Sequence, residues 1–508
     1  MKRIILIISL IFVWATTYTH TAYAQEFSSH KWHRYDNIAT HQELALRFSA
    51  NSPSIVIRYS INPKSLTTQS TPIVGLSITD NNGVVTMIEG VATIDDNQDD
   101  NQDDNQYTVH FKDGINYSAP AIKNGGYEFQ AWLPTRCVVD NIEIGVEGDS
   151  FFGFSERREE RPIVTYTTTH NSVKSTAGDS WYATLARRLD RATHNVESIE
   201  SATKIDAKAF VIDGDGDSKK MIKKMVKEIK YLRTQWVATP IIISSQELMK
   251  ELQRINIENV YLIDPQNIIN ESDRAMAYEA KLREVLHCPV GNISTTIAVS
   301  QRRVPQHKWT DQCQYILRDI ETSSAKCAII GNSIVHNWGG NPDFEKRSPN
   351  VEGQDSWVKY MGNYVNMGIG ADRIENLLWR VYNDQMEVKD FEKIIIMIGT
   401  NNLNNQTTVE EILIGVENLV EQIKIRQPSA QITLIGILPR KDMAWKELQK
   451  INAEYEKIAT RQGVAYKDIG HVLIDEDDIP IDDLFRPRDR VHPSAKGYKE
   501  LGKILGTL

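Results

Sequence analysis

Between residue 159 and the end of the chain, short apolar runs alternate with longer amphipathic stretches. The apolar runs at 209–212 and 393–398, for example, are each followed by a segment in which apolar residues recur with helical spacing. Strands that alternate with helices pair in parallel, and their helices cover both faces of the sheet. This alternation constrains the fold more strongly than any other feature, and it predicts an α/β architecture.

The alternation occurs twice, and the two series resemble each other. Strands are predicted at residues 164–166, 209–212, 240–243, 260–263, 325–330, 363–365, 393–398, 432–437 and 464–466. Helices are predicted at residues 181–189, 219–232, 373–382, 409–426, 445–462 and 495–505. We therefore interpret residues 159–296 and 322–508 as two copies of one fold, with a connector at 297–321.

Residues 25–158 have a different pattern. Apolar residues alternate with other residues at Ile55, Ile57, Tyr59 and Ile61, and convincing amphipathic helices are missing. Strict alternation is typical of a strand with one buried face. The sequence predicts a β-sandwich domain over this range.

The first 24 residues have the features of a signal peptide. Lys2 and Arg3 precede an apolar core at 4–15, and Ala22-Tyr23-Ala24 is a small-x-small cleavage site. The core is too short to span a bilayer comfortably. We expect cleavage after Ala24, export to the periplasm or the cell exterior, and no transmembrane segment in the mature chain. The net charge of −9 argues against a nucleic-acid partner.

Three residues of the last domain could form a catalytic triad. Ser333 follows the apolar run 327–330 in the sequence Gly331-Asn332-Ser333, which places its hydroxyl at a strand-to-helix turn. A serine hydroxyl needs a base, and His492 can take and return the proton. Asp489, three residues before His492, can hold the imidazole in the required tautomer.

Acyl transfer also needs donors for the oxyanion of the tetrahedral intermediate. The candidates are the Ser333 backbone N–H, a backbone N–H at Gly370 or Ala371, and the Asn401 amide. Trp338 and Asp372 are expected to border the substrate, and the indole face of Trp338 suits a sugar ring. Neither a metal ion nor an organic cofactor is expected.

These blocks resemble those of the SGNH (GDSL) hydrolases. The likeness covers roughly residues 322–508, and residues 366–380 resemble the branch of platelet-activating-factor acetylhydrolase. It implies a flavodoxin-like, three-layer α/β/α fold and a serine esterase. Two positions depart from the family pattern: Asn332 replaces the usual aspartate, and Ala371 replaces the usual oxyanion-hole glycine. The alanine favours a small acyl group.

The middle domain resembles another SGNH branch but lacks its chemical groups. Thr169 stands where the nucleophile is expected, and Thr167 replaces the glycine of the turn. Glu197 and Glu200 replace two glycines, Asp217 replaces the asparagine, and no Asp-x-x-His-Pro precedes the connector. We predict that this domain is catalytically inactive.

The whole pattern predicts a secreted esterase that removes O-acetyl groups from carbohydrate, either a polysaccharide or sialic acid. Two alternatives remain open at this point. One is a lipid acylhydrolase or lysophospholipase, and the other is a glycan-binding envelope protein with little catalysis. The oligomeric state is not determined by the sequence.

Overall fold

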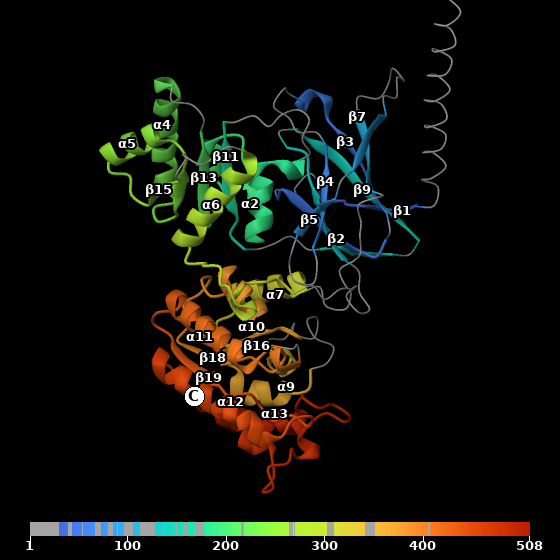
Figure 1. Cartoon of the computed structure of the whole chain (residues 1–508), viewed down its shortest axis with the longest axis vertical. Helices are drawn as coiled ribbons and strands as arrows, with labels where there is room; N and C mark the ends of the chain where they lie inside the picture. The colour runs from blue at the N-terminus through green and yellow to red at the C-terminus, as the bar shows by residue number, and fades with distance from the viewer. Residues whose placement is uncertain are drawn as a thin grey trace, which may run out of the picture. The chain divides into compact units, whose positions relative to one another are not determined.

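The computed structural model describes most of the chain as two compact units (Figure 1). The described residues are 30–38, 43–52, 54–66, 73–79, 85–88, 90–95, 105–111, 127–135, 137–148, 150–155, 160–168, 177–214, 218–263, 268, 270–301, 309–340, 351–404 and 407–508. The first unit holds the described residues up to Phe154 together with 177–183, and the second holds 160–168 and 184–508. The expected signal peptide, Thr169 and Asp217 lie outside the described residues.

The first unit contains two antiparallel five-stranded sheets. One has the order β1-β9-β3-β7-β6 and the other β10-β2-β8-β4-β5. Their strands are β1 (His30–Arg34), β2 (Ala45–Ala50), β3 (Ile55–Ile61), β4 (Gly75–Thr79), β5 (Val85–Ile88), β6 (Val91–Asp95), β7 (Asn105–Phe111), β8 (Tyr127–Trp132), β9 (Val139–Glu147) and β10 (Phe151–Phe154).

Alternating side chains of both sheets form one buried core. Ile57 and Tyr59 from β3 belong to the same cluster as Phe48 from β2 and Phe129 from β8. The rings of Phe48 and Phe129 stack with centroids 5.3 Å apart. The predicted β-sandwich is therefore confirmed.

The second unit contains two parallel five-stranded sheets. The middle sheet has the order β12-β11-β13-β14-β15 and the C-terminal sheet β17-β16-β18-β19-β20. The middle strands are β11 (Ile163–Thr167), β12 (Thr193–Asn195), β13 (Ala209–Asp213), β14 (Ile241–Ile243) and β15 (Val260–Leu262). The C-terminal strands are β16 (Cys327–Gly331), β17 (Tyr364–Gly368), β18 (Lys393–Met397), β19 (Gln431–Ile435) and β20 (Ala465–Lys467).

Both sheets have the strand order 2-1-3-4-5, which is the flavodoxin-like order. The middle domain's helices include α3 (Ile199–Ala202), α4 (Lys219–Gln235), α5 (Gln246–Arg254) and α6 (Glu271–Val285), and α2 (Trp181–Leu189) precedes β12. Two domains with one topology agree with the interpretation of a duplicated fold. The predicted α/β class is confirmed.

Helices cover both faces of the C-terminal sheet. One face packs against α7 (Trp309–Thr322), α10 (Ile374–Tyr382), α11 (Val409–Arg426) and α12 (Trp445–Gln462). The other packs against α8 (Ser333–His336), the short π-helix η8 (Trp357–Met361) and α13 (Ala495–Leu505). Because every parallel strand ends at the same edge, the loops after β16, β17 and β18 meet there.

The structure corrects the prediction of a connector at 297–321. Residues Trp309–Thr322 form the helix α7, and Trp309, Cys313 and Ile316 lie in the hydrophobic core of the C-terminal domain. Polar residues such as Asp311 and Gln314 are also buried on this helix. They interrupt the apolar periodicity, which explains why the helix was missed.

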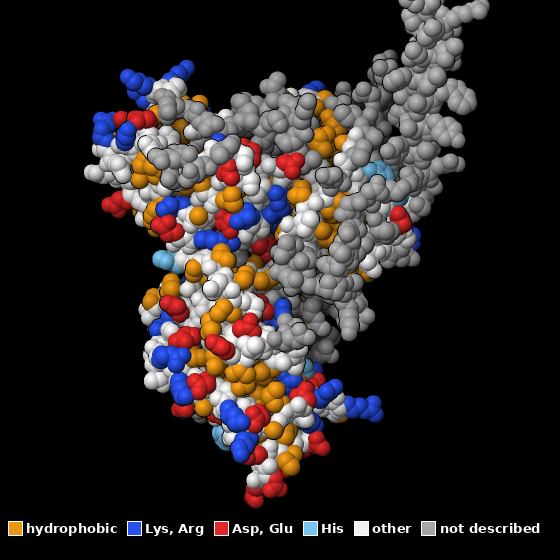
Figure 2. Space-filling view, in the orientation of Figure 1, with side chains coloured by type: hydrophobic (Ala, Val, Ile, Leu, Met, Phe, Trp, Pro, Cys, Tyr) orange, Lys and Arg blue, Asp and Glu red, His pale blue; other side chains and the backbone are white. Residues whose placement is uncertain are grey.

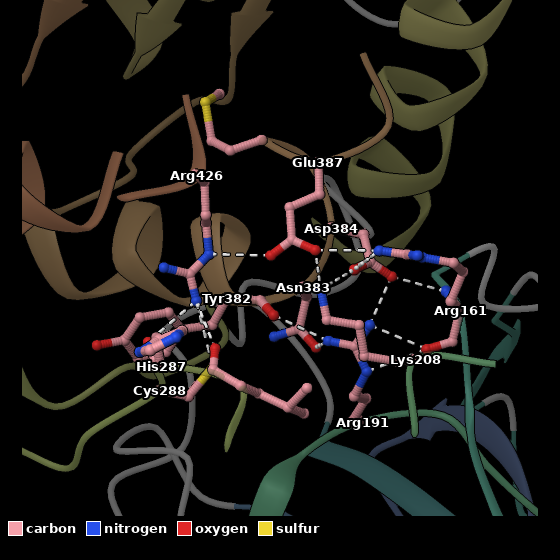
Figure 3. Close-up of polar contacts among 12 residues, drawn as sticks. Arg161, Arg191, Lys208, His287, Cys288, Tyr382, Asn383, Asp384, Glu387 and Arg426 are labelled. Carbon is pink, nitrogen blue, oxygen red and sulfur yellow. Dashed lines mark hydrogen bonds and ion pairs between the residues drawn. The ribbon is translucent and has the colours of Figure 1, made fainter. Parts of the chain in front are cut away.

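Buried charges join the middle domain to the C-terminal domain (Figure 3). The carboxylate of Asp384 is 1% exposed. It pairs with Arg191 at 2.5 Å, Lys208 at 3.1 Å and Arg161 at 3.4 Å, and all three cations come from the middle domain. Glu387 in turn contacts Arg161, Lys208 and Arg426. The two domains are thus joined by ion pairs, of which those of Asp384 with Arg191 and Lys208 are buried.

The outer surface of the C-terminal domain is mixed in charge. On the face drawn in Figure 2, basic and acidic side chains are interspersed. Lys450 pairs with Glu447 at 2.8 Å and Lys457 with Glu454 at 2.7 Å along α12. Within the described residues, no helix has the length and apolar character needed to cross a membrane.

Candidate active site

Ser333 lies at the turn between β16 and α8. Strand β16 ends at Gly331, where a Cβ atom would lie 2.3 Å from the Met397 carbonyl oxygen, so this position requires glycine. Asn332 caps α8 by accepting a hydrogen bond from the Ile334 N–H at 2.9 Å. The exchange of aspartate for asparagine therefore costs no cap bond. The turn leaves Ser333 partly exposed.

His492 and Asp489 approach Ser333 from the loop that precedes α13. The Ser333 Oγ lies 2.7 Å from His492 Nε2, and His492 Nδ1 lies 2.8 Å from Asp489 Oδ2. Asp489 Oδ1 also accepts the backbone N–H groups of Val491 and His492. The structure therefore brings the three predicted triad residues into one hydrogen-bonded chain.

The ionisation of Asp489 determines which atoms donate and which accept in these two hydrogen bonds. Burial alone raises the pKa of Asp489, but hydrogen bonds from the Val491 and His492 backbones and from the imidazole lower it below its ordinary value. An ionised carboxylate can only accept, so His492 Nδ1 carries a proton and donates it. His492 Nε2 then has a free lone pair that accepts the Ser333 hydroxyl proton.

Two of the predicted oxyanion donors, besides the Ser333 N–H, lie on neighbouring loops. Ala371 follows β17, and Asn401 follows β18 after Gly399, whose φ of +112° a side chain would strain. The Asn401 amide donates one hydrogen to the Asp372 carbonyl oxygen at 2.9 Å, which leaves its second hydrogen available. The Ala371 and Ser333 N–H groups have no acceptor in the described part of the chain.

The prediction of Gly370 as an oxyanion donor is wrong. Its N–H donates to His336 Nδ1 at 3.0 Å, and His336 is buried. The hydrogen bond both occupies this donor and fixes the backbone just before Ala371. Of the two neighbours, Ala371 is the one that remains available.

The prediction of Trp338 as a substrate-binding residue is also wrong. The indole is fully buried, its Nε1–H donates to Ser356 Oγ at 2.8 Å, and its ring packs against Trp357 and Tyr498. It is a core residue of the second face of the sheet. It cannot present a ring face to a sugar.

Asp372 is likewise buried rather than placed against a substrate. It is 0% exposed, and its Oδ2 pairs with Arg380 Nη1 at 2.7 Å. Its Oδ1 accepts from Trp309 Nε1 at 2.6 Å and Gln301 Nε2 at 2.9 Å. Burial raises the pKa of Asp372 to about 6, although these donors act in the opposite direction. Neither Gln301 nor Trp309 could be predicted as a partner of Asp372 from the sequence, because both precede the recognised blocks.

Ala371 has a conformation that explains why its position favours glycine. Its φ is +64°, in the left-handed region where a side chain costs about 1–2 kcal/mol. We expect Ala371→Gly to raise the free energy of unfolding by about 1 kcal/mol, measured by urea denaturation. Ala453→Gly, on the exposed face of α12, should instead lose about 0.5–1 kcal/mol. Equal effects at the two sites would contradict the assigned backbone strain.

The corresponding edge of the middle sheet holds a structural ion pair. Asp213, 0% exposed, pairs with Arg274 at 2.7 Å and accepts hydrogen bonds from Tyr278 and Thr167. In the strand register Asp213 lies opposite Thr167, as Met397 lies opposite Gly331 in the C-terminal sheet. Both Glu197 and Glu200 are exposed. Charged side chains therefore fill the edge at which the C-terminal domain carries its polar loops.

The comparisons with known proteins agree with this geometry. The model of the GDSL-like lipase/acylhydrolase family matches residues 329–500. The alpha2 subunit of platelet-activating factor acetylhydrolase IB from Rattus norvegicus is 33% identical over 209 residues, which are 40% of this chain and 83% of the relative. The chain belongs to the GDSL-like lipase/acylhydrolase family. It is a serine hydrolase with esterase activity.

Two solved structures that are similar to the chain are more distant in sequence. A GDSL-like lipase from Bacteroides thetaiotaomicron is 17% identical and covers 39% of this chain and 96% of its own, with a TM-score of 0.31. A carbohydrate acetylesterase from Sinorhizobium meliloti is 16% identical and covers 36% and 97%, with a TM-score of 0.28. Similarity at this level does not bear on the substrate of the chain.

Proposed function

We propose that the C-terminal domain hydrolyses acetyl esters, with Ser333 as nucleophile, His492 as general base and acid, and Asp489 as the group that orients His492. The observation that carries the proposal is the chain of two hydrogen bonds, 2.7 and 2.8 Å long, from Ser333 through His492 to Asp489. Geometry of this kind activates a serine that is otherwise a weak nucleophile.

The proposed reaction has two halves. Ser333 Oγ attacks the ester carbonyl carbon while its proton passes to His492 Nε2. The negative carbonyl oxygen accepts hydrogen bonds from the Ser333 and Ala371 N–H groups and the Asn401 amide. The intermediate then expels the alcohol, which takes the proton from His492. Water attacks the acyl-serine by the same route, releases the acid and restores Ser333.

Two considerations support acetyl as the acyl group. The rat relative is by name an acetylhydrolase. In addition, Ala371 adds a methyl group beside the proposed oxyanion site, where glycine would leave more room. The carbohydrate part of the proposal rests on the predicted export signal and the β-sandwich. A glycan-bearing substrate outside the cytoplasm would suit an exported enzyme.

We propose the following domain organisation. Residues 1–24 are a signal peptide, 25–158 a β-sandwich, 159–296 an inactive α/β domain, and the remainder the esterase. The ion pair of Asp213 with Arg274 supports inactivity, because it occupies the sheet edge of the middle domain. The catalytic part begins before residue 322, since α7 contributes to its core.

The test is a comparison of acyl chain lengths with the mature protein. We expect kcat/KM for p-nitrophenyl acetate to exceed that for the octanoate by at least about tenfold, because a long acyl group must find room beside Ala371. Acetate release from acetylated xylan and from acetylated sialic acid identifies the sugar class. The Ser333→Ala variant, assayed on each substrate, gives the uncatalysed rate to be subtracted. A preference for the octanoate would contradict the proposal and favour the lipid acylhydrolase, which the likeness to platelet-activating factor acetylhydrolase also allows.

A further inference from the structure

Gln301 contacts the loop of the proposed oxyanion donors from outside the matched family region. Its side-chain Nε2 donates to the Gly370 carbonyl oxygen at 3.1 Å and to Asp372 Oδ1 at 2.9 Å. We propose that Gln301 is a positioning residue that fixes the Ala371 N–H in the orientation needed for the oxyanion. This inference rests on the proposed function, because it takes the Ala371 N–H as a donor.

One peptide group links Gln301 to the Ala371 N–H. The Gly370 carbonyl and the Ala371 N–H belong to the same planar trans peptide, so they point in opposite directions. A hydrogen bond that holds the Gly370 oxygen therefore also sets the direction of the Ala371 N–H. The bond polarises the peptide as well, and a polarised N–H is a stronger donor.

The backbone strain at Ala371 favours a flip of the Gly370–Ala371 peptide. A flip of the Gly370–Ala371 peptide would move the φ of Ala371 from +64° to negative values, which an alanine prefers. The flipped peptide would aim a carbonyl oxygen, rather than an N–H, at the proposed oxyanion site. Gln301 opposes the flip because its hydrogen bond to the Gly370 oxygen would be lost.

The amide of Gln301 has one bonding arrangement that fits its surroundings. Nε2 faces two acceptors, while Oε1 is buried and has no partner among the described residues. Exchanging the two atoms would place Oε1 against the Gly370 oxygen and the Asp372 carboxylate, which would repel it. An unpaired buried acceptor such as Oε1 is unfavourable. The two hydrogen bonds from Nε2 to the loop are nevertheless kept, and Oε1 is left without a partner among the described residues.

The segment that delivers Gln301 is fixed at several points. The Val299 N–H donates to the Glu375 carbonyl at 3.1 Å, and Asn376 Nδ2 donates to the Val299 carbonyl at 2.9 Å, so α10 holds the segment. Ser300 Oγ donates to the carboxylate of Asp190 in the middle domain. The proposed inactive domain therefore helps to hold the residue that positions the oxyanion loop.

The test replaces Gln301 with methionine in the full mature protein. Methionine has nearly the same length and shape but no N–H to donate. We expect kcat for p-nitrophenyl acetate to fall about 10- to 100-fold while KM changes less than about twofold, since a misplaced Ala371 N–H stabilises the transition state less but hardly affects substrate binding. Gln301→Glu, which places acceptors against acceptors, should lose at least as much.

A thionoester separates positioning from a general structural effect. Its thiocarbonyl sulfur is a poor hydrogen-bond acceptor, so the oxyanion donors contribute little to its hydrolysis. The Gln301→Met loss should therefore be several-fold smaller on an aryl thionoacetate than on the matching acetate. An equal loss on both substrates, or an unchanged kcat on the acetate, would overturn the inference.

Gln427→Met is the matched control. Gln427 Nε2 also donates to two backbone carbonyls, those of Met386 and Lys389, but it lies just after α11, away from the catalytic loops. Its replacement should leave kcat within about twofold of the unchanged protein.

Ser333→Ala separates the positioning role from the proposed function. If Ser333→Ala stays active, the proposed function fails. If Ser333→Ala is inactive but Gln301→Met is fully active, only the positioning role is overturned.

Discussion

Ser333→Ala is expected to reduce kcat for p-nitrophenyl acetate by about 10⁴- to 10⁶-fold, the scale seen when a triad nucleophile is removed. The hydroxyl is the atom that must attack the carbonyl, and His492 Nε2 lies 2.7 Å from it. His492→Ala should lose a similar factor, because without the base the hydroxyl keeps its proton. The double variant should be hardly worse than either single one, since both act in one step. Initial rates with a spectrophotometric assay provide the measurement.

Ser323→Ala is the control for this experiment. Ser323 lies just before β16, near the opposite end of the strand from Ser333, and its Oγ accepts the Ala325 N–H at 3.0 Å. Its activity should match that of the unchanged protein. Turnover by Ser333→Ala at more than about a hundredth of the normal rate would exclude Ser333 as the nucleophile.

Asp384→Asn is expected to lower the free energy of unfolding by about 3–5 kcal/mol, because it removes one partner of a buried ion cluster. The carboxylate faces Arg161, Arg191 and Lys208. An amide of the same shape cannot neutralise them, so the buried Arg191 and Lys208 would lose this counter-ion, and Glu387 would be the remaining acid of the cluster. Urea unfolding at neutral pH measures the loss. Glu392→Gln breaks the exposed pair of Glu392 with Lys326, which solvent screens, and should have a much smaller effect on the free energy of unfolding.

The effect of Asp384→Asn should depend on pH in a defined direction. Burial raises the pKa of Asp384, but Arg191, Lys208 and Arg161 together hold it well below its usual range. Its contribution is therefore complete above about pH 4, the usual value for an unfolded aspartate, and declines as the pH falls further. The difference between the two proteins should narrow below about pH 4. A difference that stays constant down to pH 2 would contradict the ion-pair explanation.

The sequence predicts most of the C-terminal fold because its periodic elements are long and locally consistent. The predicted C-terminal helices at 409–426, 445–462 and 495–505 have the same bounds in the structure, and so does the helix at 181–189, which precedes the second strand of the middle sheet. Helix α7 was missed because buried polar side chains interrupt its apolar pattern. In the middle domain, α5 and α6 were also missed, and β12 is only three residues long.

In the site, too, residues with recognisable chemistry could be predicted from the sequence, whereas contacts that depend on tertiary packing could not. Ser333, Asp489 and His492 could be selected because serine, histidine and aspartate carry recognisable chemistry at the ends of predicted strands or in loops. The buried positions of Trp338 and Asp372 could not be predicted from the sequence, since an aromatic or acidic residue that follows a catalytic block can also belong to the core. Only packing shows that Trp338 donates to Ser356 and that Asp372 pairs with Arg380. The occupied N–H of Gly370 depends on His336, a contact between loops.

The ion cluster around Asp384 also limits how the molecule can be dissected. A fragment that starts at residue 322 would retain Asp384 and Glu387 but lose the basic side chains of Arg161, Arg191 and Lys208. It would also lack Trp309 and Gln301, which bind the Asp372 carboxylate. Asp384 would then lose all three of these cations, while Glu387 would keep its ion pair with Arg426. We therefore expect the hydrolase domain to be less stable as a fragment than in the full chain, because the middle domain supplies the cations that neutralise Asp384.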